Sequence, residues 1–245
     1  VLGLAAPLRA AEPVDLELVL LADASGSIDA REIALQREGY AEALLDAEVL
    51  WAIAHGGRLG RIAVTYVEWA GAASQDVVAG WTLIDGPEAA AAFGARLVAA
   101  PRQARGSNAI GAALLKGLDL IETSGFDGAR KVIDLSADSS WNAQGPPIEA
   151  AREAVVAAGV TINGLAVLCL EAACTGRPRI EDLEAEFERR LIGGLGAFVV
   201  TAEDGPSFRR AVKRKLILEI AGLDPREAEF AHKNGKDAPA RAMTD

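Results

Sequence analysis

The stretch that decides the fold is Leu16-Glu17-Leu18-Val19-Leu20-Leu21-Ala22-Asp23-Ala24-Ser25-Gly26-Ser27-Ile28-Asp29. It begins as a nearly continuous apolar run, which is typical of a strand buried on both faces of a parallel sheet. The run ends at Asp23, and the hydroxyls of Ser25 and Ser27 follow at alternate positions with a glycine between them. Oxygen-bearing side chains at the mouth of a buried strand suit a hard cation such as Mg²⁺.

The residues after this loop predict a helix over 29–45, with apolar side chains at helical spacing. Asp29 is suited to cap its first turn, and Glu32 stands at the capping-box position three residues later. The order is therefore strand, oxygen-rich loop and helix. The alternative for the loop is an ordinary strand-to-helix turn, where Asp and Ser are favoured as capping residues.

Farther along the chain, strand-like and helix-like segments alternate almost throughout. Residues 61–69 and 75–83 predict two strands joined by a short loop, and therefore an antiparallel pair at a sheet edge. Residues 49–54 are apolar and ambiguous. We expect an α/β fold with a doubly wound, mostly parallel central sheet, one antiparallel edge strand and helices on both faces. Further strands are predicted over 131–135, 160–168 and 197–201, and helices over 87–99, 107–122, 146–158, 180–191 and 206–220.

The pattern predicts one domain over residues 14–222 and a polar, mobile tail over 223–245. Residues 1–13 read either as the remnant of a signal peptide or as a disordered N-terminus. The first reading predicts an exported protein, periplasmic or extracellular. No later stretch reaches the ~18 uninterrupted apolar residues of a spanning helix. Cys169 and Cys174 are suited either to a small disulfide loop or to remain two thiols.

Composition and charge narrow the classes of function. Apolar residues make up 51% of the chain and charged residues 24%, which is a globular composition. A formal net charge of −10 argues against general binding to nucleic acid or to an anionic membrane. The chain has two histidines, so catalysis by a well-placed histidine has few candidates.

Two further oxygen-rich segments are placed to join the first loop. Residues 136–140 follow a predicted strand and contain Asp138, whereas Gly106-Ser107-Asn108 opens a predicted helix. In doubly wound sheets, ligands bind outside the carboxyl ends of the strands, where the strand order reverses. We therefore expect these segments to converge. Asp134, inside an apolar strand, is expected to be a buried structural acid.

At this point the sequence resembles von Willebrand factor type A domains. Asp-x-Ser-x-Ser after the first strand, a hydroxyl-bearing loop before a central helix and the distant Asp138 resemble their metal-ion-dependent adhesion site. The resemblance covers about residues 14–221. The wider wording is similar to an uncharacterised bacterial family of exported von Willebrand A-like proteins; the matching phrases are 35–40, 66–69, 81–85, 132–136, 159–165 and 192–200.

The resemblance implies a set of metal ligands. Ser25 and Ser27 are expected to bind Mg²⁺, or Ca²⁺ or Mn²⁺, through their hydroxyls, with Asp23 and Asp138 holding it directly or through water. The family uses a Thr in the helix-opening loop, and this chain has none there. Ser107 is chemically closer to Thr, while Asn108 stands at the corresponding place. Both side chains offer an oxygen that Mg²⁺ or Ca²⁺ accepts.

The resemblance also implies a function, namely a binding module that grips an Asp or Glu carboxylate of a protein partner through the ion. Glu68 and Trp141 are candidates for the partner surface, with structural roles as the alternative. A metal-dependent hydrolase is a second hypothesis, although no phosphate loop and no Gly-x-Ser-x-Gly motif is present. A structural domain that has lost metal binding is a third. We expect no enzymatic activity.

Basic residues suggest no additional site. Arg102 and Arg105 precede the Ser107 loop and are expected to keep it soluble, with attraction of an acidic partner as the alternative. The last predicted helix has a basic face that is expected to be solvated, as most such faces are; its members are Arg209, Arg210, Lys213, Arg214 and Lys215.

Overall fold

The computed structural model of the protein describes residues 10–168, 182–203 and 205–223. Cys169 and Cys174 lie outside the described residues, as does most of the predicted tail. No helix of the described part is both long and apolar enough to cross a bilayer.

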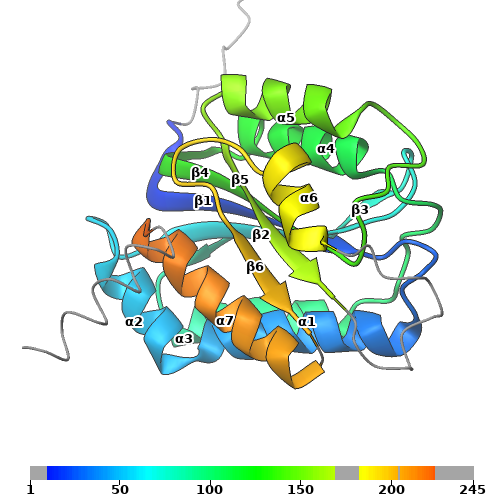
Figure 1. Ribbon diagram of the computed structural model, residues 1–245. Helices are drawn as coiled ribbons and strands as arrows, with labels where there is room; N and C mark the ends of the chain where they lie inside the picture. The colour runs from blue at the N-terminus through cyan, green and yellow to red at the C-terminus, as the bar shows by residue number, and fades with distance from the viewer. Residues whose placement is uncertain (1–9, 169–181, 204, 224–245) are drawn as a thin grey trace, which may run out of the picture.

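A single six-stranded sheet forms the centre of the molecule, in the order β3-β2-β1-β4-β5-β6 (Figure 1). Neighbouring strands are parallel except β2 and β3, which pair antiparallel at one edge. The predicted fold class is therefore confirmed. The strands are β1 (Glu12–Asp23), β2 (Ile62–Trp69), β3 (Gln75–Ile84), β4 (Phe126–Ala137), β5 (Thr161–Val167) and β6 (Val199–Ala202).

Helices cover both faces of this sheet, as Figure 1 shows. On one face lie α1 (Ala30–Leu45), α2 (Ala47–His55), α3 (Pro87–Ala99) and α7 (Gly205–Ala221). The other face carries α4 (Ile110–Glu122), α5 (Ile148–Ala157) and α6 (Leu183–Arg190). Each face has its own apolar core, one built around Tyr40, Phe93 and Phe208 and the other around Trp69 and Phe187.

The apolar run of β1 explains its central position. Side chains alternate between the faces of a strand, so Leu18 and Leu20 enter the core under α1 and α7, while Val19 and Leu21 enter the core under α4 and α5. A strand that is buried on both faces needs neighbours on both edges, and β1 has β2 and β4. The chain proceeds from β1 toward β2 and from β4 toward β5, so the strand order reverses between β1 and β4.

Some local boundaries differ from the predictions. The Asp29 cap and its capping box with Glu32 are present as predicted, and the ambiguous segment forms α2. The predicted helix over 107–122 begins only at Ile110, because the residues before it remain in an irregular loop. Ser107 and Asn108 therefore belong to this loop and not to a helix.

Candidate metal site at the switch point

The Asp-x-Ser-x-Ser loop begins at the carboxyl end of β1 and is folded tightly against its own carboxylate. Asp23 is 1% exposed, and Ser25 is fully buried. One carboxylate oxygen of Asp23, Oδ1, accepts a hydrogen bond of 2.8 Å from the backbone N–H of Ser25. The hydroxyl oxygens of Ser25 and Ser27 are 3.2 Å apart. The alternation of these residues thus places two hydroxyls side by side next to a buried carboxylate.

The second carboxylate predicted for the site, Asp138, lies close to the first. Burial, followed by the negative charge of Asp138, raises the pKa of Asp23 to about 7, although hydrogen bonding from Ser25 opposes the shift. In the described part of the chain, the other oxygen of Asp23, Oδ2, is buried without a hydrogen-bond partner. A buried carboxylate with an unpartnered oxygen, close to a second one, fits a divalent cation, which would offset both charges.

The helix-opening loop meets the other two loops at the same edge. The backbone N–H of Gly26 donates to the carbonyl of Gly106 at 2.9 Å, and the side-chain amide of Asn108 donates to Ser139 Oγ at 2.8 Å. Asn108 is 2% exposed, whereas Ser107 is exposed. Because its amide nitrogen faces Ser139, the oxygen of Asn108 is the side-chain atom left for a cation.

Glycine is required at the point where this loop turns. Gly106 has φ +121°, a conformation that side-chain-bearing residues rarely adopt, and a Cβ built there would lie 3.0 Å from the backbone of Gly71. The backbone conformation and the close contact with Gly71 thus explain why a glycine precedes Ser107 and Asn108. The glycine allows close contact with the β2–β3 turn, and Asn108, two residues later, contacts the loop after β4.

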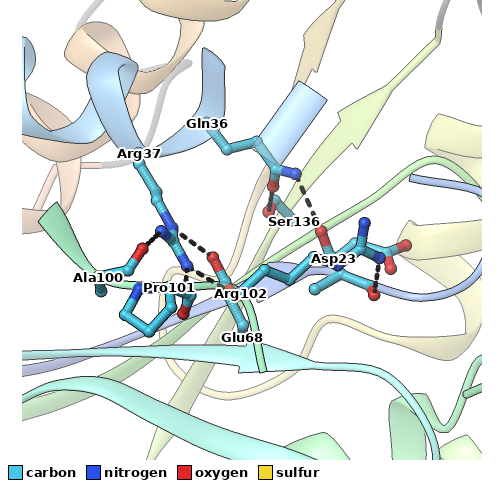
Figure 2. Close-up of polar contacts among 9 residues, drawn as sticks. Asp23, Gln36, Arg37, Glu68, Ala100, Pro101, Arg102 and Ser136 are labelled. Carbon is cyan, nitrogen blue, oxygen red and sulfur yellow. Dashed lines mark hydrogen bonds and ion pairs between the residues drawn. The ribbon is translucent and has the colours of Figure 1, made fainter. Parts of the chain in front are cut away.

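Helix α1 supports the loop through the side chain of Gln36. The Gln36 side chain donates to the backbone carbonyl of Asp23 at 2.9 Å and accepts a weaker bond of 3.4 Å from Ser136 in β4. Figure 2 shows the amide of this glutamine reaching both Ser136 and Asp23. It links β1 and β4 at the place where Asp23 and Asp138 emerge.

Among the described residues, no group of three or more His, Cys, Asp and Glu side chains is arranged to hold a metal. The candidate site therefore depends on hydroxyl and amide oxygens in addition to its two carboxylates. Such an all-oxygen donor set suits Mg²⁺, Ca²⁺ or Mn²⁺ better than softer transition metals.

The expectation that Glu68 contacts a partner is wrong. Its side chain is fully buried and forms a two-pronged ion pair with Arg37 of α1, with N–O distances of 2.7 and 3.0 Å. The sequence correctly predicted that Glu68 lies near the end of a strand, here β2. It could not predict the buried ion pair, because Arg37 belongs to helix α1, which is distant in the chain. Glu68 is therefore a structural residue in this fold.

Trp141, the other residue predicted for a partner surface, is 51% exposed. It lines an open cavity of about 540 Å³ that starts two residues after Asp138 in the chain. The cavity lies between the loop after β4, the start of α5 and the end of α6; its lining comprises Ser140, Trp141, Asn142, Gly145, Pro147, Ile148, Glu149 and Arg190.

Sequence reasoning missed two basic residues that are in fact structural. Arg102 donates to backbone carbonyls of the Asp23 loop instead of being a solvated loop residue. Lys215 is fully buried, not part of a solvated face, and forms ion pairs with Asp134 at 2.7 Å and with Glu219 at 2.5 Å. This pairing confirms Asp134 as a buried structural acid. The sequence gives no local signal for these contacts, because the carbonyls that Arg102 contacts, and Asp134, which pairs with Lys215 across the interface, are distant in the chain.

Comparisons with solved structures identify proteins of similar fold. Proximal thread matrix protein 1 from the mussel byssus has a TM-score of 0.58 at 16% identity, over 85% of this chain and 48% of its own. The pilus adhesin SpaC of Lactobacillus rhamnosus GG gives 0.56 at 11%, over 88% and 31%. The von Willebrand factor domain of the type V pili tip protein Mfa5 of Porphyromonas gingivalis gives 0.55 at 9%, over 86% and 96%.

These likenesses establish the fold, which is that of von Willebrand factor type A domains. The chain spans about half of the mussel protein and about a third of the adhesin. A search of curated proteins found no match. A family model described as "Protein of unknown function (DUF1194)" matches residues 13–224, nearly the whole described chain, so the protein belongs to that family.

Proposed function

We propose that this protein is a metal-dependent binding module that holds an Asp or Glu carboxylate of a protein partner through a divalent ion. Two observations support the proposal: three oxygen-rich loops contact one another at the switch point, and the buried Asp23 there has an oxygen without a hydrogen-bond partner in the described chain. The ion would be Mg²⁺, Ca²⁺ or Mn²⁺. We do not expect catalysis, because the site offers no histidine and no activated nucleophile.

Each residue has a definite task in this proposal. Ser25 and Ser27 would hold the ion through their hydroxyls, Asn108 or the exposed Ser107 would add an oxygen from the helix-opening loop, and Asp23 and Asp138 would balance its charge. When bound, the ion supplies Lewis acidity and an open coordination position for a carboxylate. Neutral hydroxyl ligands leave more of that acidity for the partner than carboxylate ligands would.

The proteins of similar fold support the proposal of an adhesive role. They are a pilus adhesin, a pilus tip protein and a byssal thread protein. A leader-like stretch at the start of the chain is consistent with export to the periplasm or the cell exterior. Export would place the site where it could meet a protein partner outside the cytoplasm.

Thermal unfolding with and without divalent ions tests the metal site. At pH 8, where Asp23 is ionised, millimolar Mg²⁺ or Mn²⁺ should raise the melting temperature of the wild type by several degrees over its value in chelator, through mass action. Asp23→Ala should melt at the same temperature in ion and in chelator. The matched control is Asp127→Ala, an exposed acid at the opposite end of β4, which should keep the wild-type shift.

Equal melting temperatures of the wild type in chelator and in each ion would contradict the metal proposal and favour the purely structural domain.

The hydrolase hypothesis has its own test. Turnover of a generic phosphate or ester substrate that disappears in Asp23→Ala would replace the binding module with an enzyme. For the partner, capture from a cell-envelope extract should require the ion and should fail with Asp23→Ala.

A further inference from the structure

Arg102 makes an unusual set of contacts with the Asp-x-Ser-x-Ser loop. Its guanidinium donates from Nη1 to the carbonyl of Ile28 at 2.8 Å, and from Nη2 to the carbonyls of Ala24 at 2.7 Å and Ser25 at 3.2 Å. One half-buried side chain thus holds the beginning and the end of the loop. No other described side chain donates to more than one carbonyl of residues 24–28.

These carbonyls belong to the same peptide units that orient the candidate ligands. Ala24 and Ser25 lie between Asp23 and Ser27, so fixing their carbonyls fixes the direction of the intervening side chains. The guanidinium is planar and presents its N–H groups as a rigid fork, which a flexible ammonium group cannot reproduce. A rigid fork on three carbonyls keeps the two serine hydroxyls side by side, as observed at 3.2 Å.

The segment that carries Arg102 is itself held in place by Arg37. The two residues before it, Ala100 and Pro101, offer their backbone carbonyls to Arg37, which is fixed by its ion pair with Glu68. Figure 2 shows Arg37 between Glu68 and the segment that carries Arg102. The order of support therefore runs from a buried ion pair, through a loop backbone, to the candidate metal site.

We propose that Arg102 is a positioning residue that organises the Asp23–Ser27 loop for metal binding. This inference rests on the proposed metal site but assigns a role to a residue outside its ligand set. Arg102 contacts carbonyl oxygens and not the ion, so its removal changes affinity by loosening the ligands. Partners of metal ligands of this kind are typically worth roughly 10- to 100-fold in affinity.

Calorimetric titration with Mn²⁺ at pH 8 tests the assignment, together with the melting temperature of each variant in chelator. Arg102→Gln should bind Mn²⁺ at least tenfold more weakly than the wild type. Arg102→Lys keeps the charge and one donor group, so it should recover part of the lost affinity. Arg105→Gln, in the same loop but exposed, should bind as the wild type does.

The outcomes separate this inference from the proposed function. A wild type that binds no Mn²⁺ overturns the metal site itself. A wild type that binds, with Arg102→Gln binding equally well, overturns only the positioning role, and a lower melting temperature in chelator would then mark Arg102 as purely structural. If Arg102→Gln does not fold, Arg102→Lys decides, because unchanged affinity in that variant contradicts the need for a fork.

Discussion

At the scale of single residues, the site depends on buried polar groups whose partners come from elsewhere in the chain. The ion pair of Arg37 and Glu68 is the clearest example, with both side chains almost completely shielded from water. Such a pair stabilises only while both members are present, because removal of one leaves the other charged and desolvated.

Glu68→Gln should therefore destabilise the fold by about 3–5 kcal/mol, the usual cost of breaking a buried pair. Urea-induced unfolding measures this loss. Glu38→Gln is the matched control, since Glu38 forms an exposed ion pair with Arg209, and pairs of that type contribute about 0–1 kcal/mol. Equal effects of the two substitutions would contradict the structural role assigned to Glu68.

Gly106→Ala probes the conformation of the helix-opening loop. Alanine at φ +121° is strained and would press against the backbone of Gly71, so a loss of roughly 1–3 kcal/mol is expected. The variant should also weaken Mn²⁺ binding, because Asn108 follows two residues later. Gly80→Ala, where an added Cβ meets nothing within 4 Å, is the control. Retention of full stability by Gly106→Ala would show that the loop adapts to a side chain.

The sequence predicted the residues whose signal is local. Asp23, Ser25 and Ser27 stand at alternate positions after an apolar run, and Asp29 with Glu32 forms a capping box over four residues. The buried state of Glu68 and the hydrogen bonds of Arg102 could not be predicted in this way. Their partners lie 31 or more residues away, and only the packed structure brings them together.

At the scale of elements, helix α7 attaches to the sheet through a buried charged cluster. Lys215 of α7 pairs with Asp134 of β4 and with Glu219 one turn later, and Asn163 of β5 donates to Glu219 at 3.0 Å. A basic pattern in the sequence suggested a solvated face. The acid that pairs with Lys215 across the interface comes from a different element, so helical periodicity alone could not assign this lysine to the core.

This cluster makes stability depend on pH. Burial raises the pKa of Glu219 to about 7, with the positive charge of Lys215 opposing the shift and Asp134 adding to it. Its pKa in the unfolded chain is near 4.5. Between these values the folded protein holds a proton that the unfolded chain has released, so stability is full below about pH 4.5 and is lost as pH rises toward 7.

Glu219→Gln should remove this part of the pH dependence, because the amide stays neutral throughout. Free energies of unfolding at pH 5 and pH 8, measured in chelator, give the comparison. The wild type should lose on the order of 2 kcal/mol more than the variant between the two values, at about 1.4 kcal/mol per unit of pKa shift. Parallel pH profiles for both proteins would contradict a raised pKa at Glu219.

Some helix boundaries are set by the local sequence, and others by contacts with residues that are distant in the chain. Helix α3 spans Pro87–Ala99 as predicted, since proline favours a first turn. Helix α4 starts three residues later than predicted, because Asn108 bonds to Ser139 and to the backbone of the loop after β4 instead of continuing the helix. That displacement keeps Ser107 and Asn108 in a loop next to the site.

At the scale of the whole molecule, topology determines where the site lies. β1 and β4 are neighbours at the reversal of strand order, and the loops that follow them contain Asp23 and Asp138. The alternation of elements was sufficient to predict this edge of the sheet and the convergence of its loops. It was not sufficient to predict which side chain of the helix-opening loop is buried there.

The most direct test of the metal site is crystallography with Mn²⁺ and anomalous diffraction at the manganese edge. The proposal predicts one strong peak between the three loops, bound by the hydroxyls of Ser25 and Ser27, with Asp23, Asp138 and an oxygen from Ser107 or Asn108 completing the surroundings. Crystals saturated with Mn²⁺ that show no anomalous peak at this position, or a peak only elsewhere, would contradict the proposal.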